Sequence, residues 1–135
     1  MPEIRADGIA VYVYRKTEPV APAGASSRRP QHAYEFLQIF RSSEADGYEH
    51  SWQTVYGGVK KKESAVEAAL RELKEETNLK PIRMFQVEFL ETFYFRPKDY
   101  VLVMPVFGVE VSRTAKITLN EEHTDYRWIA EKRIG

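Results

Sequence analysis

The chain has 135 residues, the length of one domain, which excludes a two-domain enzyme. Hydrophobic residues make up 43% of it and charged residues 30%, so there is enough apolar surface for a packed core and global disorder is excluded. Twenty basic residues balance twenty acidic ones, which argues against a protein held to nucleic acid or to a membrane by bulk charge. The absence of cysteine excludes disulfide scaffolds, zinc ribbons and thiol nucleophiles.

The N-terminus has no features of an export signal. Acidic residues stand at positions 3 and 7, where a signal peptide would have a basic segment and then an apolar stretch, so we expect a cytoplasmic protein. The longest nearly apolar run, Tyr100 to Val109, is about half of the ~20 residues that a membrane span requires. We therefore predict no membrane span.

The first half of the chain reads as strands and loops. Ile9 to Tyr14 and Tyr34 to Phe40 are rich in β-branched and aromatic residues, which predicts two strands paired as a hairpin. The segment between them is rich in proline, glycine and serine, which predicts a flexible loop over residues 17–32. A second polar stretch, residues 42–51, precedes a short strand over residues 52–56 that ends at Gly57 and Gly58.

The second half contains the one convincing helix. Ser64 and Glu67 fit a capping box, Ala65 to Thr77 contains no glycine or proline, and Asn78 marks the end of the helix. Two long strands follow, over residues 85–95 and 100–111, joined by a turn at residues 96–99, and a last strand is expected over residues 125–129. This order of elements, without an internal repeat, predicts a single α+β or mixed α/β domain.

A helical wheel divides the helix into two stripes. We expect one to face the core and consist of Val66, Ala69, Leu70 and Leu73. The other contains Glu72, Glu75 and Glu76, whose like charges repel one another and lie at the helix end that disfavours anions. We expect Ala65 and Ala68, small residues on this second face, to leave room there for a ligand.

A bound cation would remove both of these penalties. Ligands that are all oxygen suit Mg²⁺ or Mn²⁺ better than zinc, and the histidines at 32, 50 and 123 show no metal-ligand spacing. The alternative is that the glutamates form a solvated helix face without a ligand.

The spacing around this helix resembles a known signature. Gly57, five residues, Glu63, seven residues and then Arg71-Glu72-Leu73-Lys74-Glu75-Glu76-Thr77-Asn78-Leu79 is similar to the box of the Nudix hydrolases, which binds divalent metal and pyrophosphate. The one departure is Asn78, where the family has glycine, and asparagine is the best substitute in a left-handed helix end. The resemblance implies an α/β/α sandwich with a mixed central sheet and one box helix over residues 1–135. The C-terminal helix with which the family usually closes has no predicted counterpart before Gly135.

The resemblance also implies a chemistry and its residues. It implies a Mg²⁺- or Mn²⁺-dependent pyrophosphohydrolase that cleaves a nucleoside diphosphate linked to another group by attack of water on phosphorus. Glu72, Glu75 and Glu76 are the implied metal ligands, with one of them also the candidate base. The Gly57 carbonyl and Glu122 are the implied additional ligands. Arg71 would orient a box carboxylate with Glu63 as its partner.

Substrate choice is less constrained. Trp52-Gln53-x-Val55-x-Gly57 and Glu122-His123-x-x-Tyr126-x-Trp128 resemble the bacterial dihydroneopterin triphosphate and dATP pyrophosphohydrolases, which favours a triphosphate. ADP-ribose and dinucleoside polyphosphates are alternative substrates, and a nucleotide-sensing module without catalysis is an alternative function. The candidate substrate-binding residues are Arg5 and Arg41 for phosphate and Trp52 and Tyr56 for stacking, although strand aromatics also build cores. We expect a nucleotide-like small molecule as partner, with no nucleic acid or membrane, and leave a homodimer open.

Overall fold

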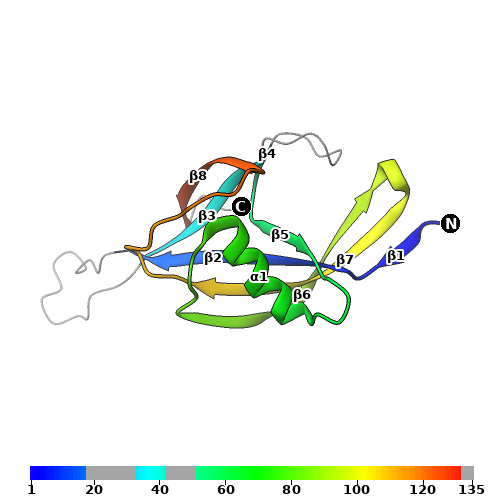
Figure 1. Ribbon diagram of the computed structural model, residues 1–135, viewed down its shortest axis with the longest axis horizontal. Coiled ribbons are helices and arrows are strands. Elements are labelled where there is room, and N and C mark those ends of the chain that lie inside the picture. The colour runs from blue at the N-terminus through cyan, green and yellow to red at the C-terminus, as the bar shows by residue number, and fades with distance from the viewer. Residues whose placement is uncertain (18–32, 42–50, 132–135) are drawn as a thin grey trace, which may run out of the picture.

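The computed structural model describes residues 1–17, 33–41 and 51–131. It contains a mixed sheet of eight strands and, within the described residues, one α-helix (Figure 1). The elements in chain order are β1 (Glu3–Arg5), β2 (Gly8–Lys16), β3 (Tyr34–Arg41), β4 (Ser51–Gln53), β5 (Val55–Gly58), α1 (Ala65–Thr77), β6 (Arg83–Phe95), the 3-10 turn η1 (Arg96–Lys98), β7 (Tyr100–Glu110) and β8 (His123–Ala130).

Strand β2 is the centre of the sheet. It pairs in parallel with β7 and antiparallel with both β3 and β5, and its residues Ile9, Val11 and Val13 are fully buried. The antiparallel pairs β2 with β3 and β6 with β7 confirm the two strand pairings predicted from the sequence. The short strand β1 was not predicted, because its three residues are ordered by parallel pairing with β7 and not by a local pattern.

Helix α1 begins and ends at the predicted residues. The Ser64 side chain accepts a hydrogen bond from the Glu67 backbone and the Glu67 side chain accepts one from the Ser64 backbone, so the capping box is complete. Asn78 adopts the left-handed conformation, with φ of 57°, and its backbone N–H donates to the Lys74 carbonyl. These caps fix the helix length independently of the sheet.

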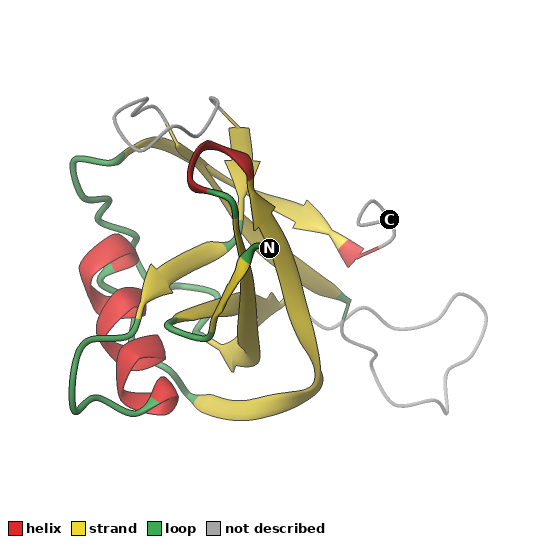
Figure 2. Ribbon diagram, turned by 90° about the vertical axis from the view of Figure 1, so that its right-hand side faces the viewer, coloured by secondary structure: helices red, strands yellow, loops and turns green. Residues whose placement is uncertain are grey.

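The predicted core face of α1 is partly wrong. Val66 and Leu70 are 48% and 40% exposed, whereas Ala68 is fully buried with Ala69 and Leu73. Small side chains at this face let the helix lie close against β2 and β5, which it contacts directly, on one side of the sheet (Figure 2). Relative to the predicted core face, the buried face of α1 is rotated about the helix axis, and this places the side chain of Glu76 in the interior of the protein.

The two polar loops predicted from the sequence lie mostly outside the described residues. Residues 18–32, most of the predicted flexible loop, and residues 42–50 of the second polar stretch lie outside. At the C-terminal end, the described chain ends one residue after β8. No helix among the described residues is long and apolar enough to cross a membrane.

Candidate active site

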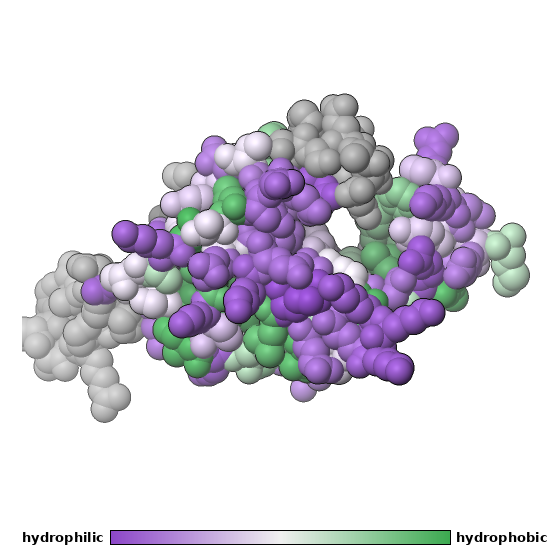
Figure 3. Space-filling view, viewed as in Figure 1, coloured by the Kyte–Doolittle hydropathy of each residue, from purple (hydrophilic) through white to green (hydrophobic). Residues whose placement is uncertain are grey.

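A cleft of about 730 Å³ lies where the start of β2, the end of β5, helix α1 and the β6–β7 hairpin meet. Its lining combines acidic, basic and apolar side chains. Figure 3 shows the molecule hollowed between the hydrophilic surface over α1 and the part formed by β6 and β7. The side chains that line the cleft include Arg5, Arg41, Tyr56, Glu72, Glu91, Phe93, Tyr100, Leu102, Met104 and Glu122, together with the backbone of Gly57 and Gly58.

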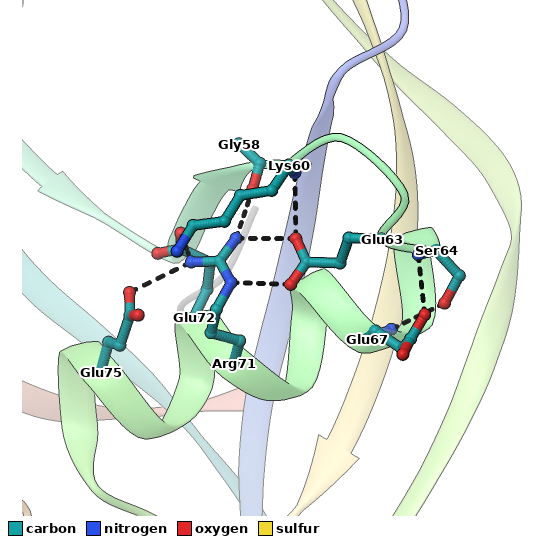
Figure 4. Close-up of polar contacts among 8 residues, drawn as sticks. All are labelled: Gly58, Lys60, Glu63, Ser64, Glu67, Arg71, Glu72 and Glu75. Carbon is teal, nitrogen blue, oxygen red and sulfur yellow. Dashed lines mark hydrogen bonds and ion pairs between the residues drawn. The ribbon is translucent and has the colours of Figure 1, made fainter.

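Arg71 connects the helix to the loop before it. Its guanidinium donates two hydrogen bonds to Glu63, of 2.8 and 3.0 Å, and one of 2.7 Å to the Gly58 carbonyl (Figure 4). It also donates to Glu72 at 2.7 Å and to Glu75 at 3.2 Å. Hydrogen bonds from Arg71 hold the pKa of Glu63 at about 2, so Glu63 stays ionised and the loop stays fastened to the helix.

Glu72 packs against the backbone of β5. A Cβ atom at Gly57 would lie 2.2 Å from both Cγ and Cδ of Glu72, so only glycine leaves room for this side chain. Burial raises the pKa of Glu72, while the hydrogen bond from Arg71 acts in the opposite direction. Gly57 and Arg71 together position the Glu72 carboxylate at the edge of the cleft.

Glu76 is buried, which argues against the alternative of a solvated helix face for this residue. Its side chain is 2% exposed, and its Oε2 atom has no hydrogen-bond partner among the described residues. Burial, and then the charges of Glu72 and Glu122, raise the pKa of Glu76 to about 9. Glu75, in contrast, is 50% exposed and turned toward Arg71, so the three box glutamates occupy three different environments.

Glu72, Glu76 and Glu122 form what we call the acidic group. The side of this group that faces α1 comes from Glu122 and from the start of β8. Strand β8 pairs antiparallel with β3, with Arg41 opposite His123 and a register shift at Phe40/Arg41. This pairing brings Glu122 beside Arg41, with 3.7 Å between the Glu122 Oε2 and Arg41 Nη1 atoms. Donor atoms of Glu76, Glu122 and His123 lie within 4.8 Å of one another.

His123 is a site residue that the sequence reasoning missed. Its Nε2 atom lies 3.6 Å from Glu76 Oε1, and the ring is fully buried. Burial lowers the pKa of His123 to about 4, with a smaller contribution from the charge of Arg41, so the imidazole is neutral. The only sequence signal was its position directly after Glu122, because its partner Glu76 belongs to a distant helix.

The donor set fits a divalent cation. A buried carboxylate oxygen without a hydrogen bond is costly, and a cation between Glu76 and Glu122 would remove that cost and the repulsion between the two charges. Carboxylate oxygens are typical ligands of Mg²⁺ and Mn²⁺.

The predicted substrate-binding residues separate into two places. Arg5, Arg41 and Tyr56 line the cleft. Trp52 instead lines a neighbouring pocket of about 240 Å³, to which Tyr56 also contributes. The Trp52 ring packs against Phe40, with 5.2 Å between ring centroids, and under the guanidinium of Arg127, at 4.1 Å.

Tyr56 is held by a carboxylate of the hairpin. Glu91 accepts a hydrogen bond of 2.6 Å from Tyr12 and also interacts with the Tyr56 hydroxyl. Burial raises the pKa of Tyr56, and the hydrogen bond to Glu91 adds to the effect. Tyr56 therefore acts as a fixed neutral wall between the cleft and the neighbouring pocket.

Comparison with known proteins gives results that are consistent with the predicted fold. A family model described as the NUDIX domain matches residues 20–134. The Ap4A hydrolase of C. elegans, in a binary complex, superposes with a TM-score of 0.68 at 23% identity, over 96% of this chain and 82% of the other. The dihydroneopterin triphosphate pyrophosphohydrolase of E. coli superposes with a TM-score of 0.62 at 22% identity, over 96% and 83% of the two chains.

A third similar structure is the NUDIX domain of Shewanella oneidensis NrtR complexed with ADP ribose, with a TM-score of 0.66 at 15% identity over 99% of this chain and 76% of the other. No curated protein sequence matches the chain significantly. At these identities the structural likeness establishes the fold, and the family model covers most of the chain.

Proposed function

This chain belongs to the Nudix hydrolase family, whose members act on phosphoric anhydrides, and from this premise we propose that it is a Mg²⁺- or Mn²⁺-dependent pyrophosphohydrolase of nucleotide-like triphosphates. The observation that carries the proposal is the buried carboxylate of Glu76, whose Oε2 atom has no hydrogen-bond partner in the described part of the chain and lies in an acidic group beside the cleft. A merely solvated acidic stripe would not bury this group.

The proposed metal ligands are Glu72, Glu76 and Glu122, with the Gly57 carbonyl completing the set. Glu75 is a fifth candidate, although its carboxylate is turned toward Arg71. A bound divalent cation supplies charge neutralisation for the phosphate oxygens and lowers the pKa of a coordinated water. Arg71 and Glu63 keep Glu72 in place through hydrogen bonds of 2.7 to 3.0 Å.

The proton of the attacking water needs an acceptor. Glu72 Oε1 already accepts a hydrogen bond from Arg71, which leaves Oε2 as the oxygen that takes the proton. Arg41, beside Glu122, and Arg5, beside Asp7, both line the cleft, where their guanidinium groups would bind substrate phosphates. The residues of this chain would thus contribute to the reaction by positioning the substrate phosphates and the attacking water and by supplying charge.

The cleft is suited to a small substrate with a charged end and an apolar end. Its volume of about 730 Å³ is in the usual range for small-molecule sites. Glu72 and Glu122 contribute acidic side chains to its lining, and Phe93, Tyr100 and Leu102 contribute an apolar wall. A nucleoside triphosphate or dihydroneopterin triphosphate-like molecule would place its phosphates at the acids and its ring system at the apolar wall.

The test is formation of pyrophosphate, phosphate or free nucleotide from a substrate panel with Mg²⁺ and with Mn²⁺. The panel contains nucleoside triphosphates, dihydroneopterin triphosphate, ADP-ribose and dinucleoside polyphosphates. We expect turnover of a triphosphate, and Glu76→Gln should reduce it by roughly 10² to 10⁴, as for the loss of another key electrostatic group.

The matched control is Glu121→Gln, which removes the same charge from an exposed neighbour of Glu122. It should leave turnover near that of the wild type. Preferred turnover of ADP-ribose or of a dinucleoside polyphosphate would replace the substrate proposal. Binding of nucleotides without product release from any of them would instead indicate a sensing module.

A further inference from the structure

His123 has an imidazole nitrogen directed at the acidic group. Its Nδ1 atom lies 3.1 Å from Asn120 Oδ1, an oxygen that also accepts a hydrogen bond of 3.3 Å from the Glu122 backbone N–H. Because an amide oxygen only accepts, Nδ1 carries the hydrogen, and in the neutral imidazole Nε2 then carries a lone pair. A histidine whose Nδ1–H is fixed by a carbonyl oxygen is the usual arrangement of a metal-ligating imidazole.

The lone pair of Nε2 has no strong protein partner within the described residues. The nearest donor is the Gln53 amide nitrogen at 3.5 Å, which is long for a hydrogen bond. Glu76 Oε1 lies 3.6 Å away, and a neutral imidazole cannot donate to it from Nε2. Two donor atoms that share an ion at about 2.1 Å each lie roughly 3 to 4 Å apart, which the separation of Nε2 and Oε1 matches.

The charge around this point also favours a cation. Glu76 and Glu122 face it from opposite elements, with Glu72 nearby on α1, while Arg41 contacts Glu122 from β3. Arg41 contacts Glu122 and Arg71 contacts Glu72, whereas no ion pair with Arg or Lys is found for Glu76 among the described residues. The orphaned Oε2 of Glu76 is a second, independent sign that a positively charged ligand belongs here.

We propose that His123 Nε2 is a metal ligand together with Glu76 and Glu122, so that the site is mixed nitrogen and oxygen and selects Mn²⁺ over Mg²⁺. Imidazole nitrogen suits transition ions, whereas Mg²⁺ prefers oxygen ligands and retains its waters. This inference rests on the proposed function, since it requires that the acidic group bind a divalent cation, but it changes which cation the protein prefers.

The test is pulsed electron paramagnetic resonance of the full chain loaded with Mn²⁺, which detects a directly bound nitrogen. We expect nitrogen coupling in the wild type, a shift of its frequencies after labelling of histidine with ¹⁵N, and its loss in His123→Gln. The Mn²⁺ dissociation constant of His123→Gln should rise by about 10-fold or more, and the ratio of Mg²⁺ to Mn²⁺ dissociation constants should fall toward one. Glu121→Gln is the control and should keep both the coupling and the affinity.

Two further arms keep the result interpretable. Substitution of the histidines at positions 32 and 50 by glutamine leaves His123 as the only histidine of the chain, and the nitrogen coupling must persist in that variant even if His123→Gln fails to fold. Tight Mn²⁺ binding that needs Glu76 but shows no histidine nitrogen would overturn the role of His123 and leave the proposed function intact. Absence of Mn²⁺ binding by the wild type would overturn both.

Discussion

At the scale of single residues, Gly57 shows how a backbone position can set the chemistry of a side chain. Glu72 occupies the space that a Cβ atom at Gly57 would need, and its carboxylate is then fixed by Arg71. The adjacent Gly58 is different, since a Cβ there would meet only the Asp7 carbonyl oxygen, at an ordinary 3.7 Å. The two neighbouring glycines therefore form a natural pair of test position and control.

We predict that Gly57→Ala displaces Glu72 and lowers turnover by about 10-fold to 100-fold, because a misplacement of about 1 Å in a catalytic group can have that effect. The same variant should show a smaller increase in melting temperature on addition of Mn²⁺. Gly58→Ala should retain both properties. If the two alanine variants behave alike, the contact of Gly57 with Glu72 has no role in the site.

At the scale of elements, local sequence signals set the two ends of α1, and contact with the start of β8 sets the environment of its last turn. Its N-terminus is fixed by Ser64 and Glu67, and its C-terminus by Asn78 in the left-handed conformation. The helix therefore ends at Thr77, and Glu76 lies in the last turn, against the start of β8. A change in the C-cap would act on the same turn that carries the buried carboxylate.

For this C-cap we predict that Asn78→Ala lowers the free energy of unfolding by about 1 kcal/mol, because a left-handed backbone is unfavourable for a residue with an ordinary Cβ. Asn78→Gly should raise it by up to about 1 kcal/mol, since glycine adopts this conformation without steric cost. Denaturant unfolding in chelator measures both. Equal stability of the alanine and glycine variants would show that the cap conformation does not limit the helix.

At the scale of the whole molecule, protonation of the buried groups links stability to pH. The folded-state pKa of Glu76, about 9, lies above the ordinary value of 4.5, so the native state holds an extra proton between these values and loses stability as pH rises. Glu72, whose pKa is also raised, acts in the same direction. The folded-state pKa of His123, about 4, lies below its ordinary 6.5, so its contribution rises with pH in that interval.

The opposing contributions lead to a specific pH profile for the protein in chelator. We predict that the free energy of unfolding is nearly flat from about pH 4.5 to 6.5 and then falls up to pH 9, by at most about 1.4 kcal/mol per pH unit from Glu76. Glu76→Gln should remove most of the fall and be more stable than the wild type at pH 8, whereas Glu121→Gln should keep it. A profile that is unchanged in Glu76→Gln would mean that this carboxylate is ionised in the native state.

A bound cation should reverse this dependence, because it favours the ionised form of Glu76. The increase in melting temperature caused by Mn²⁺ should therefore grow between pH 6.5 and 8, by mass action on the native state. Melting curves with chelator and with Mn²⁺ at three pH values measure this directly. A shift that is independent of pH would place the ion away from Glu76.

The helix, its two caps, most strands and the spacing of the box could all be predicted from the amino-acid sequence. These features depend on interactions within a few residues, such as the capping box of Ser64 and Glu67, the left-handed Asn78 and the alternating strand patterns. The family resemblance rests on the same local spacing and is confirmed by the family model.

The environment of each site residue, in contrast, depends on contacts between elements that are far apart in the chain. The close packing of α1 on the sheet buried Glu76 and exposed Val66 and Leu70, which a helical wheel cannot resolve because it contains no information on the partner surface. The register of β3 against β8 placed Arg41 opposite His123 and brought Glu122 to the helix. Strand register is fixed by pairing over the whole sheet, so no local pattern could have shown that an imidazole closes the acidic group.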